Sequence, residues 1–200
     1  MKLLISSSNY IFHFISTPFT FAQVPTSWKE YNNTYRCAVF FSYPSDWTLS
    51  EERTRDRFDT SDPSIVSVRS PSSNKLPWFQ ILECAQWPRN PSLPFELYVD
   101  QFMNEFVQGL GGEIIERTHM IPDLISNSTV DAYVFTSKAS IPVYDIINGY
   151  KEHEVGIEIY WVLNNGIRYA FGYADMADRF DSPESKEMRN RILQSLKFQY

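Results

Sequence analysis

One segment of the chain has the pattern of a β-hairpin, and it restricts the fold more than any other feature. Asn165-Gly166 favours a two-residue turn between paired strands. Alternating apolar residues stand on both sides of this turn: Ile157, Ile159, Trp161 and Leu163 before it, and Ile167, Tyr169, Phe171 and Tyr173 after it. Because alternate residues of a strand face the same side of a sheet, each set predicts a strand with an apolar face. The domain is therefore expected to be built around an antiparallel sheet.

Further segments add strands to this hairpin. Apolar alternation and the turn signals between the apolar runs predict strands over residues 34–43, 65–68, 78–87, 113–121 and 129–138. The highly charged segment 50–63 is predicted to be a solvated loop. The segment 139–153 is either a long loop or an extra hairpin, because Asn148-Gly149 is a turn signal.

Two segments have the spacing of helices. The first begins near Pro94 and ends at the glycines from Gly109 onwards. Its apolar stripe, a pattern typical of core packing, consists of Phe95, Tyr98, Val99, Phe102, Phe106 and Leu110. The second follows Ser182, a good N-cap, with Pro183 in its first turn and a stripe of Met188, Ile192 and Leu196. Small residues of the preceding strand are expected to let this helix approach closely: Ala170, Gly172 and Ala174.

Seven strands, with one helix in the middle and one at the end, predict an α+β domain in which helices flank an antiparallel sheet. This single domain is expected over residues 34–200, after a polar lead-in over residues 23–33. Hydrophobic residues make up 43% of the chain, which is enough for a sizeable core. The net charge of -6 and the lack of a long Lys/Arg run argue against nucleic-acid binding.

The first 22 residues have the pattern of a secretory signal peptide. Lys2 precedes an apolar stretch, and Thr20-Phe21-Ala22 offers small residues for cleavage before Gln23. Polar residues interrupt the apolar stretch, which argues against a membrane-spanning helix. The alternative is an ordinary N-terminal tail. The signal peptide predicts an extracytoplasmic protein, secreted or held at the outer face of a membrane.

The two cysteines, Cys37 and Cys84, are an even number in a chain that is expected to be exported. They could form one disulfide, and the alternative is two buried thiols that act as small apolar side chains.

No catalytic motif occurs in the chain, and no cofactor is predicted. The nucleophile-elbow pattern Gly-x-Ser-x-Gly, a Walker-type lysine and a pair of His four residues apart around a Glu are all absent. Two weak metal-site candidates remain: Glu152, His153 and Glu154 in one segment, and Asp175, Asp178 and Asp181 in another. Strand alternation would place His153 opposite Glu152 and Glu154, so the first set is better read as a solvated acidic segment. Asp181 has a sufficient role near a helix N-terminus.

Several segments resemble the PsbP family. Phe41-Ser42-Tyr43-Pro44-Ser45-Asp46-Trp47 is similar to a family signature in which Phe41, Tyr43, Pro44 and Trp47 are the matching positions. Four later segments resemble the family in the same order: 66–71, the position of the central helix at 93–108, the hairpin that continues through Tyr173-Ala174-Asp175, and 192–198. The resemblance spans about residues 35–200. It implies a PsbP-like α/β/α sandwich, a fold shared with a Ran-binding nuclear-transport protein, and a non-enzymatic role outside the cytoplasm or in a thylakoid lumen.

These observations favour an exported, non-catalytic binding or assembly-accessory protein that docks onto a protein partner or a larger, membrane-associated complex. One alternative is a metal-assisted hydrolase that uses the acidic and histidine candidates. Another is a cytosolic GTPase-binding protein, which requires the N-terminal segment to be only a tail. A hydrolase needs a cleft in which His and carboxylates converge, whereas a docking domain should have an exposed apolar or aromatic patch.

Overall fold

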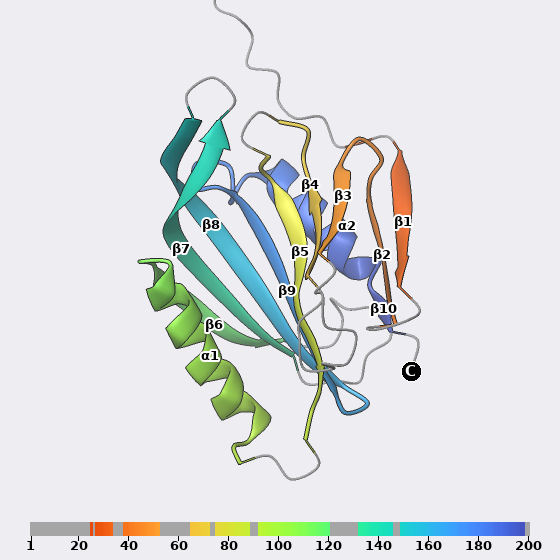
Figure 1. Cartoon of the computed structure of the whole chain (residues 1–200), viewed down its shortest axis with the longest axis vertical. Coiled ribbons are helices and arrows are strands. Elements are labelled where there is room, and N and C mark those ends of the chain that lie inside the picture. Colours follow the sequence, from red (N-terminus) through yellow and green to blue (C-terminus); the bar gives the residue numbers. More distant parts are fainter. Residues whose placement is uncertain are drawn as a thin grey trace, which may run out of the picture.

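The computed structural model describes residues 25, 27–33, 38–52, 65–72, 75–88, 92–120, 132–145 and 149–198. Within these ranges, seven strands form one antiparallel sheet in the order β3-β4-β5-β9-β8-β7-β6 (Figure 1). Their bounds are β3 Thr48–Glu52, β4 Ile65–Arg69, β5 Trp78–Gln86, β6 Glu113–Met120, β7 Ala132–Asp145, β8 Gly149–Asn164 and β9 Ile167–Met176. The predicted α+β sandwich is therefore confirmed.

A smaller sheet and two helices complete the described part of the chain. The smaller sheet has the order β1-β2-β10, with bounds β1 Trp28–Asn33, β2 Val39–Pro44 and β10 Lys197–Phe198. The helices are α1 Phe95–Gly109 and α2 Pro183–Gln194. Helix α1 packs on one face of the seven-stranded sheet, and α2 packs on the other together with the smaller sheet (Figure 1). We call these two sides the α1 face and the α2 face.

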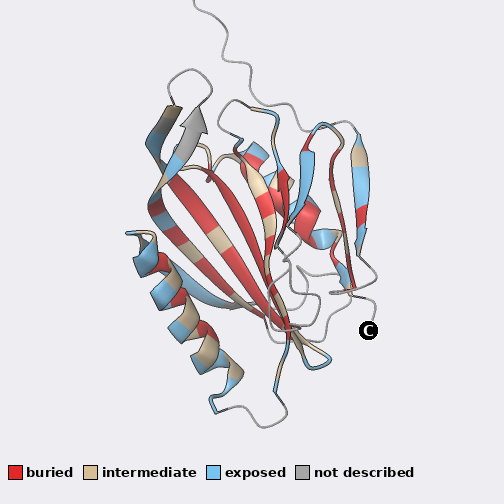
Figure 2. Cartoon of the chain, viewed as in Figure 1, coloured by how far each residue is buried: buried red, intermediate tan, exposed pale blue. Residues whose placement is uncertain are grey.

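The predicted hairpin lies in the middle of the large sheet, as β8 and β9. Asn164 pairs with Ile167, and the turn residues Asn165 and Gly166 have φ of 48° and 77°, as a type I′ turn requires. Figure 2 shows buried residues along both strands, and both faces of the hairpin are covered. The segment 139–153 is the extra hairpin rather than a loop, because β7 and β8 remain paired up to Asp145 opposite Gly149.

Helix α2 begins as predicted, with Ser182 Oγ accepting a hydrogen bond from the backbone N of Ser185 at 3.1 Å. The predicted packing surface for this helix is wrong. Residues Ile192, Leu193 and Leu196 belong to the same core as Tyr169, Phe171 and Tyr173, whereas Ala170 and Ala174 belong to the core under α1. The rings offer more apolar area to bury than alanines do. The small Gly172 leaves room for Trp78 and Leu82 of β5 instead.

Two segments that were predicted to be irregular contain strands. The second half of the polar lead-in over residues 23–33 is β1, which pairs with β2 along its whole length. Residues 50–52 of the predicted solvated loop belong to β3, which pairs with β4, while 53–64 lie outside the described residues. Both are edge strands, which can leave one side to water and so carry many polar side chains without strict apolar alternation.

Candidate functional site

The first group of metal candidates does not converge. Glu152 and Glu154 are exposed on β8, and His153 between them is half-buried. Among the residues that the structure describes, no group of three or more His, Cys, Asp or Glu side chains could hold a metal ion. These three residues therefore give no support to metal-assisted hydrolysis.

The second group is divided among separate partners. Asp175 is only 3% exposed, and its Oδ1 lies 2.7 Å from Nη2 of Arg179 while its Oδ2 accepts a hydrogen bond from Ser185 Oγ at 3.1 Å. Asp178 is exposed, and the exposed Asp181 pairs with Lys186 of α2 at 3.3 Å. Burial raises the pKa of Asp175, and the Arg179 guanidinium opposes this rise. Asp175 thus connects the end of β9 to α2.

A second buried ion pair joins α2 to the sheet. Nε of Arg189 lies 2.6 Å from Oε2 of Glu158 on β8, and the Arg189 guanidinium sits 4.8 Å from the ring centroid of Phe180. The Tyr173 hydroxyl lies 3.0 Å from Ser185 Oγ, and burial raises the pKa of Tyr173. These groups lie close together beneath α2, although Nη1 of Arg189 is buried without a hydrogen-bond partner among the described residues. A reactive site needs a group that is open to a substrate, and this arrangement instead holds the helix on the sheet.

The residues of the family signature belong to the core and to a turn. Phe41, Tyr43 and Trp47 are buried, and the backbone N of Trp47 donates to the carbonyl O of Pro44 at 3.0 Å in the turn that joins β2 to β3. The Phe41 ring centroid lies 5.1 Å from that of Phe79 on β5. The signature therefore connects the two sheets.

Cys84 is half-buried on β5, and Cys37 lies outside the described residues. A bridge between them remains a prediction.

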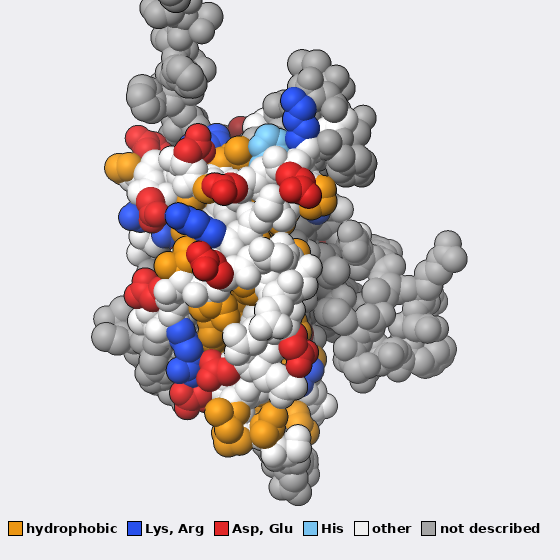
Figure 3. Space-filling view, turned by 90° about the vertical axis from the view of Figure 1, so that its left-hand side faces the viewer, with side chains coloured by type: hydrophobic (Ala, Val, Ile, Leu, Met, Phe, Trp, Pro, Cys, Tyr) orange, Lys and Arg blue, Asp and Glu red, His pale blue; other side chains and the backbone are white. Residues whose placement is uncertain are grey.

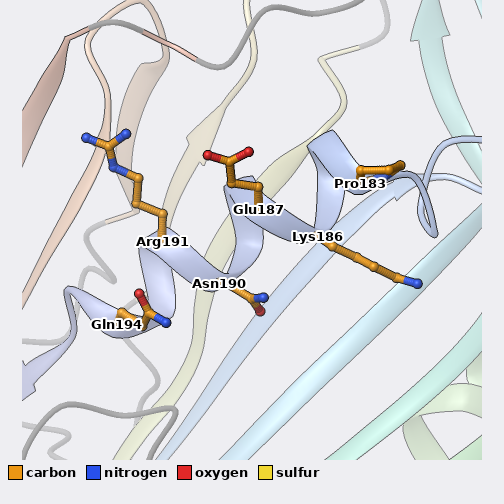
Figure 4. Close-up of a pocket in the computed structure, with 6 residues that line it drawn as sticks. All are labelled: Pro183, Lys186, Glu187, Asn190, Arg191 and Gln194. Carbon is orange, nitrogen blue, oxygen red and sulfur yellow. The ribbon is translucent and has the colours of Figure 1, made fainter.

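A shallow hollow of about 580 Å³ lies along the outer side of α2 (Figure 4). The described residues that line it are Pro183, Lys186, Glu187, Asn190, Arg191 and Gln194. All six are exposed and belong to one helix, and Arg191 lies over the Trp28 ring at 4.2 Å. These six side chains include neither a nucleophile with a neighbouring base nor an apolar floor.

Helix α1 covers the opposite face of the sheet less completely. Its fully buried residues are Val99, Met103 and Val107, so the centre of the buried stripe is displaced from the predicted one. The aromatic residues of the predicted stripe are half-buried along one side of the helix: Phe95, Tyr98, Phe102 and Phe106. We call these four the aromatic flank. Its rings pack edge-on against Trp161 of β8, with centroids 4.9 Å away for Phe102 and 5.9 Å away for Tyr98.

Two leucines at the start of α1 form an exposed apolar tip. Leu93 is 37% exposed and Leu97 is 52% exposed. Figure 3 shows hydrophobic side chains gathered at the lower end of the α1 face, where α1 begins in Figure 1. Single exposed leucines are ordinary on protein surfaces. Leu97 lies on a side of α1 away from the aromatic flank, so exposed apolar area occurs on two sides of the helix: the half-exposed rings on one and Leu97 on the other.

Two arginines are held among acids and rings on this face. Arg117 of β6 places Nη2 2.7 Å from Oε1 of Glu96 and Nε 2.7 Å from Oδ1 of Asp100, and it lies 5.4 Å from the Tyr133 ring centroid. The hydrogen bond to Glu96 raises the pKa of Arg117 further.

The second arginine, Arg168, contacts the 8%-exposed Glu83, and its guanidinium lies 4.8 Å from the Tyr98 ring centroid and 5.8 Å from that of Trp87. Burial, followed by the charge of Glu83, raises the pKa of Tyr98. These contacts hold the rings of Trp87 and Tyr98 in place beside the apolar tip.

The sequence analysis did not identify the exposed residues of α1 as a candidate surface, although the sequence contained part of the information. Leu97 falls on the side of α1 away from the apolar stripe, so a helical wheel marks it as an exposed leucine. The Glu83–Arg168 pair had no such signal, because 85 positions separate the two residues.

No family model matches the chain, and no curated protein matches it either. Solved structures do match. The solution structure of cyanobacterial PsbP (CyanoP) from Synechocystis sp. PCC 6803 covers 86% of this chain and 92% of its own, with a TM-score of 0.57 at 14% identity. A Pseudomonas aeruginosa protein of unknown function has a TM-score of 0.50 at 11% identity, over 76% of this chain and 98% of its own.

The Ran-binding protein Mog1p of Saccharomyces cerevisiae has a TM-score of 0.49 at 8% identity, over 86% of this chain and 95% of its own. Identities this low show the fold alone. The chain has a PsbP-like fold, which confirms the architecture that the sequence resemblance implied.

Proposed function

We propose that this protein is a non-catalytic accessory domain that binds a protein partner through the α1 face, and that it works outside the cytoplasm. One observation carries the proposal: Leu97 is 52% exposed on a helix whose opposite side is buried, and Leu93 just before that helix is 37% exposed. Burying such a patch against a partner removes apolar area from water, which drives most protein association.

The rest of the molecule supports a binding role over a catalytic one. The carboxylates Glu158 and Asp175 are paired with arginines beneath α2. The six residues considered for a metal site have separate environments, so the hydrolase alternative gains no support from them. The PsbP-like fold, which the chain shares with cyanobacterial PsbP, agrees with the non-enzymatic role that the sequence resemblance implied.

The location outside the cytoplasm rests on the signal-peptide pattern of residues 1–22, which lie outside the described residues. Neither helix in the described part of the chain is long and apolar enough to span a membrane. We expect mass spectrometry of the native protein to give a mature N-terminus near Gln23. Native protein that retains Met1 in the cytosol would overturn this part of the proposal and would favour the GTPase-binding alternative.

Photo-crosslinking in cells of the native host tests the docking surface. A photoreactive phenylalanine analogue replaces Leu97, and a matched variant carries it at the exposed Gln194 of α2. We expect covalent adducts with a specific protein from position 97 and none from position 194. Equal adducts at both positions, or none at position 97, would contradict docking through α1.

A further inference from the structure

We propose that the partner meets the α1 face with a positively charged segment that carries arginine, and that an apolar residue of the same segment covers the apolar tip. This inference rests on the proposed docking function and names the chemistry of the partner. It follows from the charge of the helix, from the way the surface holds its own arginines, and from one acid that has no such partner.

Helix α1 is acidic along its length. It contains Glu96, Asp100 and Glu105, and it contains no Lys, Arg or His. Arg117 of β6 pairs with the first two, so α1 contributes three carboxylates and only two of them have an arginine partner in the described part of the chain. A partner with negative charge here would be repelled, whereas a cationic segment would be attracted and oriented.

The surface already binds guanidinium groups of its own chain. Arg117 and Arg168 each combine a carboxylate contact with an aromatic ring within 5.4 Å of the guanidinium carbon. A guanidinium suits this combination better than an ammonium does, because its planar fork bonds to carboxylate oxygens while its flat face stacks on a ring. Carboxylates beside rings are therefore a repeated arrangement on this face, and arginine is the group that fills it.

A third acid of α1, Glu105, has no arginine partner among the described residues. Glu105 is exposed and lies one helical turn from Phe102, whose half-buried ring is stacked on Phe106 with centroids 6.1 Å apart. Glu105 accepts a hydrogen bond from Gln101 Nε2 at 3.0 Å, and none of the described residues forms an ion pair with it. An arginine from a partner would complete the pattern at this position.

The spacing on α1 adds a geometric condition. Glu105 and Leu97 are eight residues apart, which is about 12 Å along a helix that rises about 1.5 Å per residue. The partner segment should therefore present its arginine and its apolar residue about 12 Å apart along α1. A helix or an extended strand can both meet this condition.

Titration with synthetic peptides tests the inference on the isotope-labelled full chain. The probes are an Arg/Leu peptide with its leucines on one helical face, a Glu/Leu peptide of the same pattern, and an Arg/Ser peptide. We expect the Arg/Leu peptide to shift amide signals of α1 and β6 and to bind about tenfold more tightly than the other two, which corresponds to about 1.4 kcal/mol. Equal binding of the Glu/Leu peptide, or shifts confined to other elements, would overturn the inference.

A matched pair of charge reversals separates a local effect from the overall negative charge. Glu105 and Glu187 are exposed glutamates on α1 and α2. We expect Glu105→Lys to weaken binding of the Arg/Leu peptide about fivefold and Glu187→Lys to change it less than about twofold, because charge attraction falls off within about 10 Å at ordinary salt. Equal weakening by both would mean that only the net charge attracts the peptide, and the inference would fail.

The two proposals can fail separately. Adducts at Leu97 with a partner region that lacks Arg would overturn the charge inference and leave docking through α1 intact. Peptide binding at α1 in a protein whose position 97 forms no adducts in cells would overturn the docking function.

Discussion

One amphipathic helix covers each face of the large sheet, but the two helices differ in how much apolar side-chain area they leave exposed. On the α2 face, Ile192 and Leu193 are 0% exposed, and the buried Arg189 and Asp175 have ionic partners within the domain. On the α1 face, the aromatic flank is half-exposed and Leu97 is more than half-exposed. Both helices bury the sheet beneath them, but α1 leaves more apolar side-chain area exposed to water than α2 does.

The difference originates in the helices themselves. The apolar residues of α2 are confined to one side, and polar or charged residues fill the rest. Helix α1 has an apolar arc that covers about half of its circumference, with Leu97 outside this arc, so one sheet cannot bury all of its apolar residues. The part of a side chain that stays in water does not contribute to folding, so its apolar area remains available for binding. We therefore expect substitutions of exposed α1 residues to affect binding more than stability, and substitutions of buried α2 residues to affect stability.

The largest contrast should come from one leucine on each helix. Leu193→Ala removes a fully buried side chain and should lower the free energy of unfolding by about 2–5 kcal/mol, whereas Leu97→Ala should change it by less than about 0.5 kcal/mol. Urea denaturation of both variants measures the difference. A loss from Leu97→Ala as large as that from Leu193→Ala would show that the Leu97 side chain is part of the core.

An intermediate contrast should come from two glycines. A Cβ at Gly156 would lie 2.6 Å from Cδ1 and 2.7 Å from Cβ of the buried Phe180, while a Cβ at Gly109 in the last turn of α1 meets nothing within 4 Å. Gly156→Ala should lower stability by about 1–3 kcal/mol through overpacking. Gly109→Ala should raise it by up to about 1 kcal/mol through helix propensity. Thermal unfolding measures whether each variant loses or gains stability. No change in stability from Gly156→Ala would mean that the α2 face is loosely packed.

The smallest effect concerns pH. Burial raises the pKa of Asp175, so the folded protein keeps a proton on this carboxyl at a pH where the unfolded chain has lost it. Stability from this group is present at low pH and is lost as the pH rises from the ordinary pKa of an aspartate through the raised pKa of Asp175.

The variant Asp175→Asn should remove this pH dependence, so its stability relative to the natural protein should increase across that window and then level off. The exposed Asp178 provides the control, because Asp178→Asn should not reproduce the change. Urea denaturation at a series of pH values measures it. An opposite slope would show that Arg179 stabilises the carboxylate more than burial destabilises it.

The sequence predicted correctly those elements that depend on residues close together in the chain. The Asn165-Gly166 turn, the Ser182 cap and the apolar alternation of β8 and β9 act between near neighbours in the chain, and all three appear in the structure. The face that α2 selects could not be predicted, because it depends on how much apolar area each side of β9 offers once β5 and β8 are paired with it.

The candidate surface was predictable only in part. Leu97 departs from the helical stripe and could be recognised from the sequence, but the extent to which α1 leaves its rings uncovered depends on where it sits on the sheet. The charge pattern of α1 was also readable, whereas the contact of Arg168 with Glu83 and Tyr98 arises from pairing between β5 and β9 and from the approach of α1.

The order of synthesis limits how early in translation the smaller sheet can be completed. Strand β2 lies between β1, which is made just before it, and β10, whose Lys197 pairs with Phe40 and which is made after all the other described strands. During vectorial synthesis, β2 can form a hairpin with β1 early, but one of its edges must wait until nearly the whole domain has left the ribosome. A polypeptide halted before residue 197 should keep that edge open to chaperones or to a neighbouring chain.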